Sequence, residues 1–120
     1  SSGEESIIAL ICDITWTGGK KEYEDGSSWE SIWNFDKDGT YTRTNVEIDK
    51  DKKKKEGEIR GRWSFATPNF SVLYFGGSHY WDIKELNKKI FSFYDRTGEL
   101  NDPLMSKEYV EFHPYNEEKD

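Results

Sequence analysis

The chain has 120 residues, a formal net charge of -7, one cysteine, and 19 aromatic residues: five Trp, seven Tyr and seven Phe. This length suits a single domain that can bury its own core, and the acidic balance argues against a nucleic-acid partner, because phosphate binding needs clustered Lys and Arg. The lone Cys12 excludes an intrachain disulfide, and no apolar run approaches the ~18 to 20 residues that cross a bilayer.

The N-terminal region predicts one short helix. Residues 1–6 are expected to be a disordered tether or residues left over from the expression vector. After them the apolar residues follow the i, i+3, i+4, i+7 spacing of one helix face, so we expect a helix over residues 5–12 that runs into a strand at 13–17. The residues that carry this pattern are Ile7, Leu10, Ile11 and Ile14.

Period-two alternation then predicts β-strands. Trp29, Ser31, Trp33 and Phe35 fall on one face of a strand, and residues 36–39 form a turn with Gly at its end. A Thr/Tyr-rich strand is expected to follow over residues 40–48. The basic run at 52–55 sits among acidic residues, which favours a solvated hairpin loop.

The same rhythm continues to the end of the chain. Ile59, Gly61, Trp63 and Phe65 alternate with polar residues, which predicts a half-buried strand. Further strands are expected at residues 70–75, 80–86, 90–94 and 109–115. The fold class is therefore all-β: an antiparallel up-and-down meander of about eight strands closed into a barrel, which would remove exposed edges. This domain spans residues 7–115, and residues 116–120 are expected to fray.

Three segments resemble a known family. Residues 33–41 (WNFDKDGTY), residues 61–65 (GRWSF), and Tyr80 with Ile83 and Leu86 resemble the lipocalin-like domains of Bacteroidetes cell-envelope lipoproteins over about residues 10–112. The resemblance implies a calycin-type, lipocalin-like barrel, export through a signal peptide, and a lipidated cysteine upstream of residue 1. The implied location is the bacterial cell envelope, either outer membrane-anchored or periplasmic.

The aromatic residues supply the candidate binding site. Trp faces can stack on sugars or line an apolar cavity, although core packing is their commoner role. We expect Trp16, Trp33 and Trp63 in the core and leave Trp29 and Trp81 open between core and rim. The residues predicted to line a ligand site are Trp29, Trp33, Phe35, Trp63, Phe65, Trp81 and Phe91.

No motif points to catalysis, a metal or a cofactor. Cys12 lies in an apolar run, which is typical of a buried and inert thiol. His79 and His113 lack the clustered spacing of a metal site, and Asp36 with Asp38 is better explained by turn chemistry than by a calcium loop. We therefore expect a monomer with no enzymatic activity and no cofactor.

Two functions remain open for such a barrel. The first is a binding module that holds a small hydrophobic or amphipathic ligand inside. The alternative is an envelope interaction protein with a filled barrel, which binds a protein or glycan through residues 76–81 and the loop 95–105. A hydrolase would need two converging carboxylates, and nothing among the 24 acidic residues selects such a pair.

Overall fold

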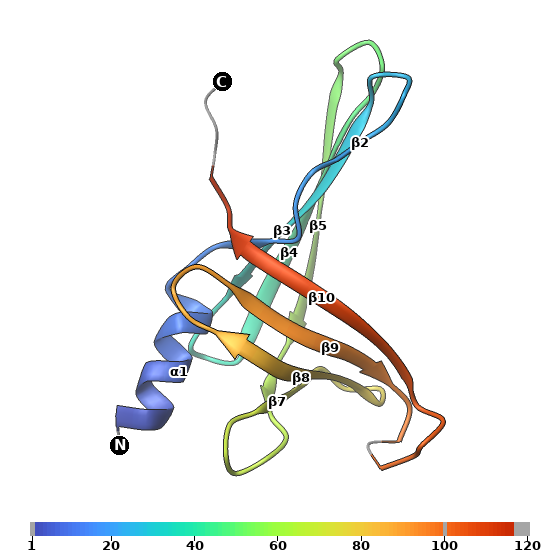
Figure 1. Cartoon of the computed structure of the whole chain (residues 1–120). Helices are drawn as coiled ribbons and strands as arrows, with labels where there is room; N and C mark the ends of the chain where they lie inside the picture. The colour runs from blue at the N-terminus through green and yellow to red at the C-terminus, as the bar shows by residue number, and fades with distance from the viewer. Residues whose placement is uncertain (1, 100, 117–120) are drawn as a thin grey trace.

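The computed structural model describes residues 2–99 and 101–116, which form one α-helix and ten β-strands (Figure 1). The helix is α1 (Ser2–Cys12). The strands are β1 (Trp16–Thr17), β2 (Lys21–Glu22), β3 (Ser28–Phe35), β4 (Thr40–Ile48), β5 (Lys54–Arg62), β6 (Ser64–Phe65), β7 (Val72–Tyr74), β8 (His79–Leu86), β9 (Phe91–Thr97) and β10 (Ser106–Pro114).

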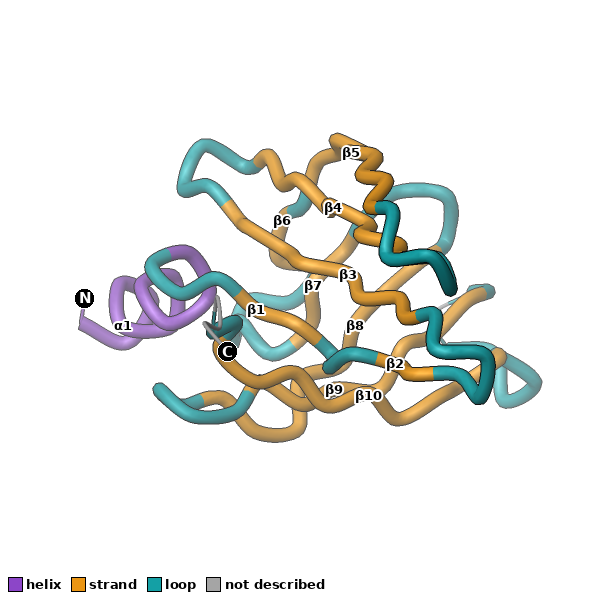
Figure 2. The backbone as a smooth tube through the Cα atoms, turned by 90° about the horizontal axis from the view of Figure 1, so that it is seen from above, coloured by secondary structure: helices purple, strands orange, loops and turns teal. Residues whose placement is uncertain are grey.

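The N-terminal helix is confirmed and starts earlier than the sequence predicts. α1 begins at Ser2, so it includes residues 2–6, which we expected to form a tether. Acidic side chains in its first turn interact favourably with the helix dipole. Ile11 is fully buried, and its carbonyl accepts the indole N–H of Trp16 at 3.2 Å, which fixes α1 beside β1 (Figure 2). Ser1 and residues 117–120, where fraying is expected, lie outside the described residues.

The strands form an antiparallel meander that is not closed. Their hydrogen-bonded order is β5-β4-β3-β1-β10-β9-β8-β7-β6, with β2 also paired to β3. Apart from the pairs made by β1, every ladder joins strands that are consecutive in the chain. The predicted meander is confirmed, but the predicted eight-stranded lipocalin-like barrel is wrong. Among the described residues there are ten strands, and no ladder joins the edge strands β5 and β6.

The strand predicted over residues 59–65 is divided by a corner at Trp63, so its two halves lie at opposite ends of the strand order. β5 ends at Arg62 and pairs with β4, whereas β6 begins at Ser64 and pairs with β7. Trp63 donates its backbone N–H to the Gly39 carbonyl at 2.9 Å and its indole N–H to the Asp36 carbonyl at 3.1 Å. These bonds anchor the corner to the β3–β4 turn.

The strand predicted to be half-buried over residues 59–65 is covered only at its far end. β5 is exposed along its whole length except for Gly61, and Ile59 is 48% exposed. Trp63 is buried and Phe65 packs against the core, but Ile59 does not belong to that cluster. Alternation therefore identifies the two faces of this strand correctly, while the facing sheet covers only one end of it.

The β3–β4 hairpin forms as the sequence predicts. β4 occupies the predicted residues 40–48, and the turn before it closes with the Gly39 N–H donating to the Asp36 carbonyl at 3.1 Å. Gly39 adopts a φ of 91°, a left-handed conformation that Gly reaches without steric penalty. β7, β8, β9 and β10 match the remaining predicted strands with shifted ends.

The core lies where β8, β9 and β10 cross the β3–β5 ribbon obliquely (Figure 1). Its rings meet mostly edge to face, as in the Trp16–Phe91 pair at 5.5 Å between centroids. The largest fully buried side chains include Trp16, Phe35, Phe91 and Phe93. Beyond this core the β3–β4–β5 ribbon continues as an arm away from α1 (Figure 1).

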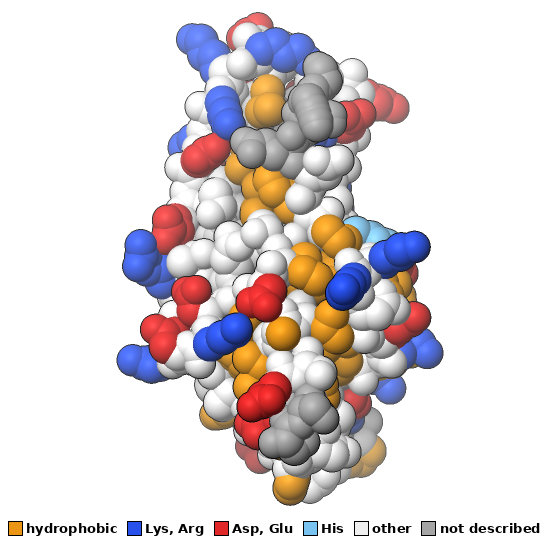
Figure 3. Space-filling model, turned by 90° about the vertical axis from the view of Figure 1, so that its left-hand side faces the viewer, with side chains coloured by type: hydrophobic (Ala, Val, Ile, Leu, Met, Phe, Trp, Pro, Cys, Tyr) orange, Lys and Arg blue, Asp and Glu red, His pale blue; other side chains and the backbone are white. Residues whose placement is uncertain are grey.

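On the face seen in Figure 3, a band of hydrophobic side chains runs along the molecule, and acidic and basic side chains are interspersed on both sides. Such mixing does not produce the single-sign field that attracts a polyanion. Across the described residues, no helix has the length and apolar character needed to traverse a bilayer.

Candidate functional site

The inner face of the sheet contains a hollow of about 400 Å³, which we call the inner hollow. One wall comes from β3 and β4, the other from β8, β9 and β10, and the segment before β2 forms a margin. The lining residues are Gly18, Gly19, Lys21, Trp29, Ser31, Trp33, Arg43, His79, Trp81, Phe93, Asp95, Glu108, Val110 and Phe112. Its volume lies in the range of small-molecule sites.

Strand register explains why the hollow is apolar at its base and polar toward the arm. On β3 and β4 the facing pairs change from Phe35–Tyr41 through Trp33–Arg43 to Ser31–Asn45. On the opposite wall the β9–β10 pairs change in the same direction, from Phe91–Phe112 to Asp95–Glu108. The inner surface thus has an aromatic closed end beside α1 and a polar open end away from it.

Two tryptophans join the walls at the base of the hollow. The Trp33 and Trp81 rings, from β3 and β8, meet at 5.0 Å between centroids with an interplanar angle of 62°. Trp81 also stacks on Phe93 at 3.9 Å and 14°. Above Trp33, the Arg43 guanidinium lies 5.4 Å from the ring centroid, which is a cation–π distance. The base therefore presents π faces next to a positive charge.

Hydrogen-bonding groups surround these rings. Arg43 Nε donates to Ser31 Oγ at 3.3 Å, and the Ser31 hydroxyl donates to Asn45 Oδ1 at 2.6 Å. On the other wall, His79 Nε2 lies 2.6 Å from Asp95 Oδ1. Polar groups from both walls therefore converge on one apolar hollow, an arrangement that can orient an amphipathic molecule.

One buried donor in this wall is unsatisfied. Trp81 is 3% exposed, and its indole Nε1 finds no hydrogen-bond partner among the described residues. Burying such a donor without a partner costs ~1–3 kcal/mol. The Ser92 hydroxyl is the other buried side-chain group without a hydrogen-bond partner among the described residues, and Ser92 does not line the inner hollow. Trp81 is thus the one lining residue of the hollow, within the described chain, that carries such an unpaired donor.

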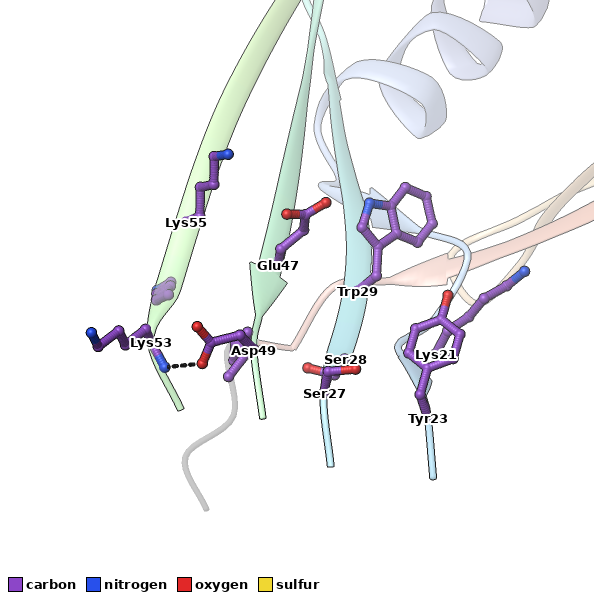
Figure 4. A pocket seen from close by; sticks show the side chains of 11 residues that line it. Lys21, Tyr23, Ser27, Ser28, Trp29, Glu47, Asp49, Lys53 and Lys55 are labelled. Atoms are coloured by element: carbon purple, nitrogen blue, oxygen red, sulfur yellow. Dashed lines mark hydrogen bonds between the residues drawn. The ribbon is translucent and has the colours of Figure 1, made fainter. Parts of the chain in front are cut away.

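A second, shallower recess of about 760 Å³, the outer hollow, adjoins the first along the arm. Figure 4 shows Trp29 of β3 between Glu47 of β4 and Lys21 of β2, and the ladders make these residues direct neighbours. Both hollows share Lys21 and Trp29. The lining residues are Lys21, Tyr23, Ser27, Ser28, Trp29, Glu47, Ile48, Asp49, Lys53, Lys54 and Lys55.

The structure separates the seven aromatic residues that the sequence proposes as a ligand site. Trp29, Trp33 and Trp81 line the inner hollow. Phe35, Trp63 and Phe91 are buried in the core, and Phe65 packs against the core beside Trp63. Trp16 and Trp63 are core residues as expected, whereas Trp33 is half-buried at the boundary between core and hollow.

Sequence reasoning missed the polar half of the site. Arg43 could have been found from the 36–39 turn, because a tight hairpin there places residue 43 opposite Trp33. The His79–Asp95 pair has no such signal, since a β-bulge between Ile83 and Glu85 shifts the register of the β8–β9 ladder that joins their strands.

The remaining reactive groups lie outside both hollows. Burial raises the pKa of the Cys12 thiol to about 11, which leaves it a weak nucleophile at neutral pH. His113 is exposed and lies 2.9 Å from a Glu111 carboxylate oxygen. Within residues 2–99 and 101–116, no three His, Cys, Asp or Glu side chains gather closely enough to hold a metal ion.

Comparison with protein-family models, curated proteins and solved structures finds no match to this chain. The resemblance to lipocalin-like envelope domains therefore stays a prediction based on sequence motifs.

Proposed function

We propose that this chain is a non-enzymatic module that binds a small amphipathic ligand in the inner hollow. The observation that carries the proposal is the pair of Trp33 and Trp81 rings at the base of a hollow of about 400 Å³, with the Arg43 guanidinium 5.4 Å from the Trp33 ring centroid. A flat apolar ligand can pack against these rings while an acceptor group on it bonds to the guanidinium.

The surroundings of Trp81 support a ligand with one flat apolar part and one polar part. Trp33 and Phe93 supply ring surface on either side of it. Arg43 and the His79–Asp95 pair supply charge and hydrogen bonds nearer the open end. Such a ligand would place its apolar part against the closed end and its polar groups toward the arm.

The test uses 1-anilinonaphthalene-8-sulfonate, a fluorescent probe that combines aromatic rings with an anionic acceptor. The variant Val110→Trp fills the hollow from β10 and should abolish probe binding. Arg43→Gln removes the guanidinium charge beside the Trp33 ring and should weaken binding of the anionic probe ~10-fold, as expected for one charge-assisted hydrogen bond. Trp63→Phe is the control, because Trp63 is buried outside the hollow, and its affinity should stay within about twofold.

Near-ultraviolet circular dichroism must show that each variant keeps its tertiary packing. If folded Val110→Trp binds the probe as tightly as the parent chain, the inner hollow is not the binding site and the proposal fails.

A second candidate function is glycan binding at the outer hollow. Tyr23 is 53% exposed and lines this recess with Trp29, so two aromatic rings are available for stacking on sugars. A glycan array should then give signals that Trp29→Ala and Tyr23→Ala remove and Val110→Trp leaves intact. The proposed location of the chain in a bacterial envelope is supported by the sequence resemblance alone.

A further inference from the structure

The strand β5 presents a long free edge. It pairs with β4 on one side, and no strand of the described chain pairs with its other side. Every residue of β5 is exposed except the half-buried Gly61. A free edge of this kind carries a row of unpaired backbone N–H and C=O groups, which is a template for another strand.

The sequence of this edge is symmetric about Ile59. Residues 56–62 read EGEIRGR, so that equivalent positions on the two sides of Ile59 carry Glu and Arg, Gly and Gly, and again Glu and Arg. If two copies pair antiparallel with Ile59 opposite Ile59, Glu58 faces Arg60, Gly57 faces Gly61, and Glu56 faces Arg62. The two-fold symmetry produces each of these pairs twice, giving four cross-strand pairs of opposite charge.

This register is specific. Centring the pair on residue 57 places Glu56 opposite Glu58, and centring it on 58 places Glu58 opposite itself. Centring it on 60 or 61 brings arginines opposite each other in the same way. Like charges directly opposite are destabilising in a sheet, so the pattern favours Ile59 as the centre.

Burial and space on β5 agree with this centre. Ile59 is an apolar side chain that is 48% exposed in the single chain, and its partner's Ile59 would cover it. The Arg60 and Glu58 side chains are 80% and 44% exposed and contact each other at 2.9 Å. Because this contact is solvent-exposed, losing it when two copies pair costs little free energy.

We propose that two copies of this chain associate through β5, with a two-fold axis at Ile59, to form one continuous antiparallel sheet. This proposal replaces the monomer expected from the sequence. Residues that face each other in a sheet share a face, so the inner hollows of both copies would open on the same side of the combined sheet. The proposed dimer does not depend on ligand binding.

The first test is sedimentation of the full chain over a range of concentrations. The weight-average mass should rise with concentration from 14.1 kDa toward twice that value. The double variant Arg60→Glu, Arg62→Glu and the double variant Glu56→Arg, Glu58→Arg should each associate at least ten-fold more weakly. An equimolar mixture of the two should recover association, because every Glu of one then faces an Arg of the other.

A matched control separates this pairing from a general effect of net charge. Lys88→Glu with Lys89→Glu changes the charge by the same amount as the arginine variant, on exposed positions between β8 and β9, and should leave association unchanged. A parent chain that stays at 14.1 kDa at all concentrations, or two charge variants whose mixture does not associate, would overturn the proposal.

The register is tested by oxidative cross-linking in a Cys12→Ser background. Only residue 59 lies opposite itself in the proposed pair, so Ile59→Cys should form a disulfide-linked dimer. Glu58→Cys, one residue away, faces Arg60 of the partner and should cross-link at least ten-fold more slowly. Equal cross-linking at both positions would contradict a fixed two-fold axis at Ile59.

Discussion

The two ends of the inner surface have the same strand alternation but different surroundings. At the closed end, Phe35 and Phe91 come from facing walls and both are almost fully buried. At the open end, Trp29 is only half-buried. The opposite wall there consists of the β9–β10 pair Asp95 and Glu108, which supplies carboxylates and no ring. An aromatic residue is buried here only where the opposite wall also supplies a ring, so alternation alone does not create a core.

The largest expected effect comes from truncating a ring at each end. Phe91→Ala should lower the free energy of unfolding by ~3–5 kcal/mol, because it opens a cavity among buried rings. Trp29→Ala should cost less than ~1 kcal/mol, since solvent already reaches its ring. Urea denaturation followed by far-ultraviolet circular dichroism measures both values. Equal losses would show that the two ends do not differ in packing.

Two glycines on β5 provide a smaller contrast. A Cβ at Gly61 would lie 2.6 Å from the Tyr41 ring, whereas a Cβ at Gly57 would meet nothing within 4 Å. Gly61→Ala should therefore destabilise the chain by ~1–3 kcal/mol through overpacking. Gly57→Ala should be neutral or slightly stabilising, because Ala restricts the unfolded chain more than Gly does.

The same denaturation experiment compares the two glycine variants. Because Gly57 and Gly61 face each other in the proposed dimer, any effect on association is common to both. The difference in stability then reports the ring over Gly61. Equal stability of the two variants would mean that Tyr41 moves aside without loss.

Thiol chemistry tests the packing of the closed end. Cys12 packs against the core, and burial raises its pKa to about 11. Since only the thiolate reacts, labelling by a disulfide reagent at pH 8 should be roughly a hundredfold slower in the folded chain than in urea. The rate should keep rising up to pH 10. A folded chain that labels as fast as the unfolded one would place the thiol in solvent.

The smallest effects concern exposed turns at the two ends. Hydrogen bonds from Thr40 lower the pKa of Asp38, and hydrogen bonds from Ser27 lower the pKa of Asp25. A carboxyl whose folded pKa is depressed stabilises the fold above its ordinary pKa of 3.8, and this contribution is lost as the pH falls through the folded value. Both groups should therefore titrate below 3.8 in an NMR experiment.

Replacing Thr40 by Val removes the hydroxyl that donates to Asp38 at 2.7 Å. The pKa of Asp38 should then move back toward 3.8, while that of Asp25 stays where it is. An unchanged Asp38 titration would show that the side-chain hydrogen bond is not the cause of the shift.

The sequence predicts strands better than it predicts what covers them. β3 and β4 could be located because alternation and the Asp36–Gly39 turn act within a few residues. Ile59 and Trp63 carry the same periodic signal, yet one is half exposed and the other 7% exposed. Their difference is set by the reach of strands that lie elsewhere in the chain, and no local pattern contains it.

Coverage by the opposite wall also decides which of the predicted aromatic residues reach the inner hollow. Trp16 and Trp63 are buried in the core as expected, whereas Trp33, expected in the core, lines the inner hollow together with Trp29 and Trp81. Trp81 and Trp29 could not be distinguished beforehand, because burial depends on the facing wall. His79 and Asp95 meet only through the folded β8–β9 ladder, so neither residue stands out in the sequence.

The two-residue strand β1 has a consequence for how the chain folds. Among the described strands it alone links β3 to β10 in the hydrogen-bonded order, through Trp16 opposite Trp33 on one side and Pro114 on the other. On either side of this link, each strand pairs with its neighbour in the sequence. The β2–β5 and β6–β10 arrays can therefore each form through local contacts. The rate-limiting event should then be the meeting of the two chain ends at β1, after both hairpin arrays have formed.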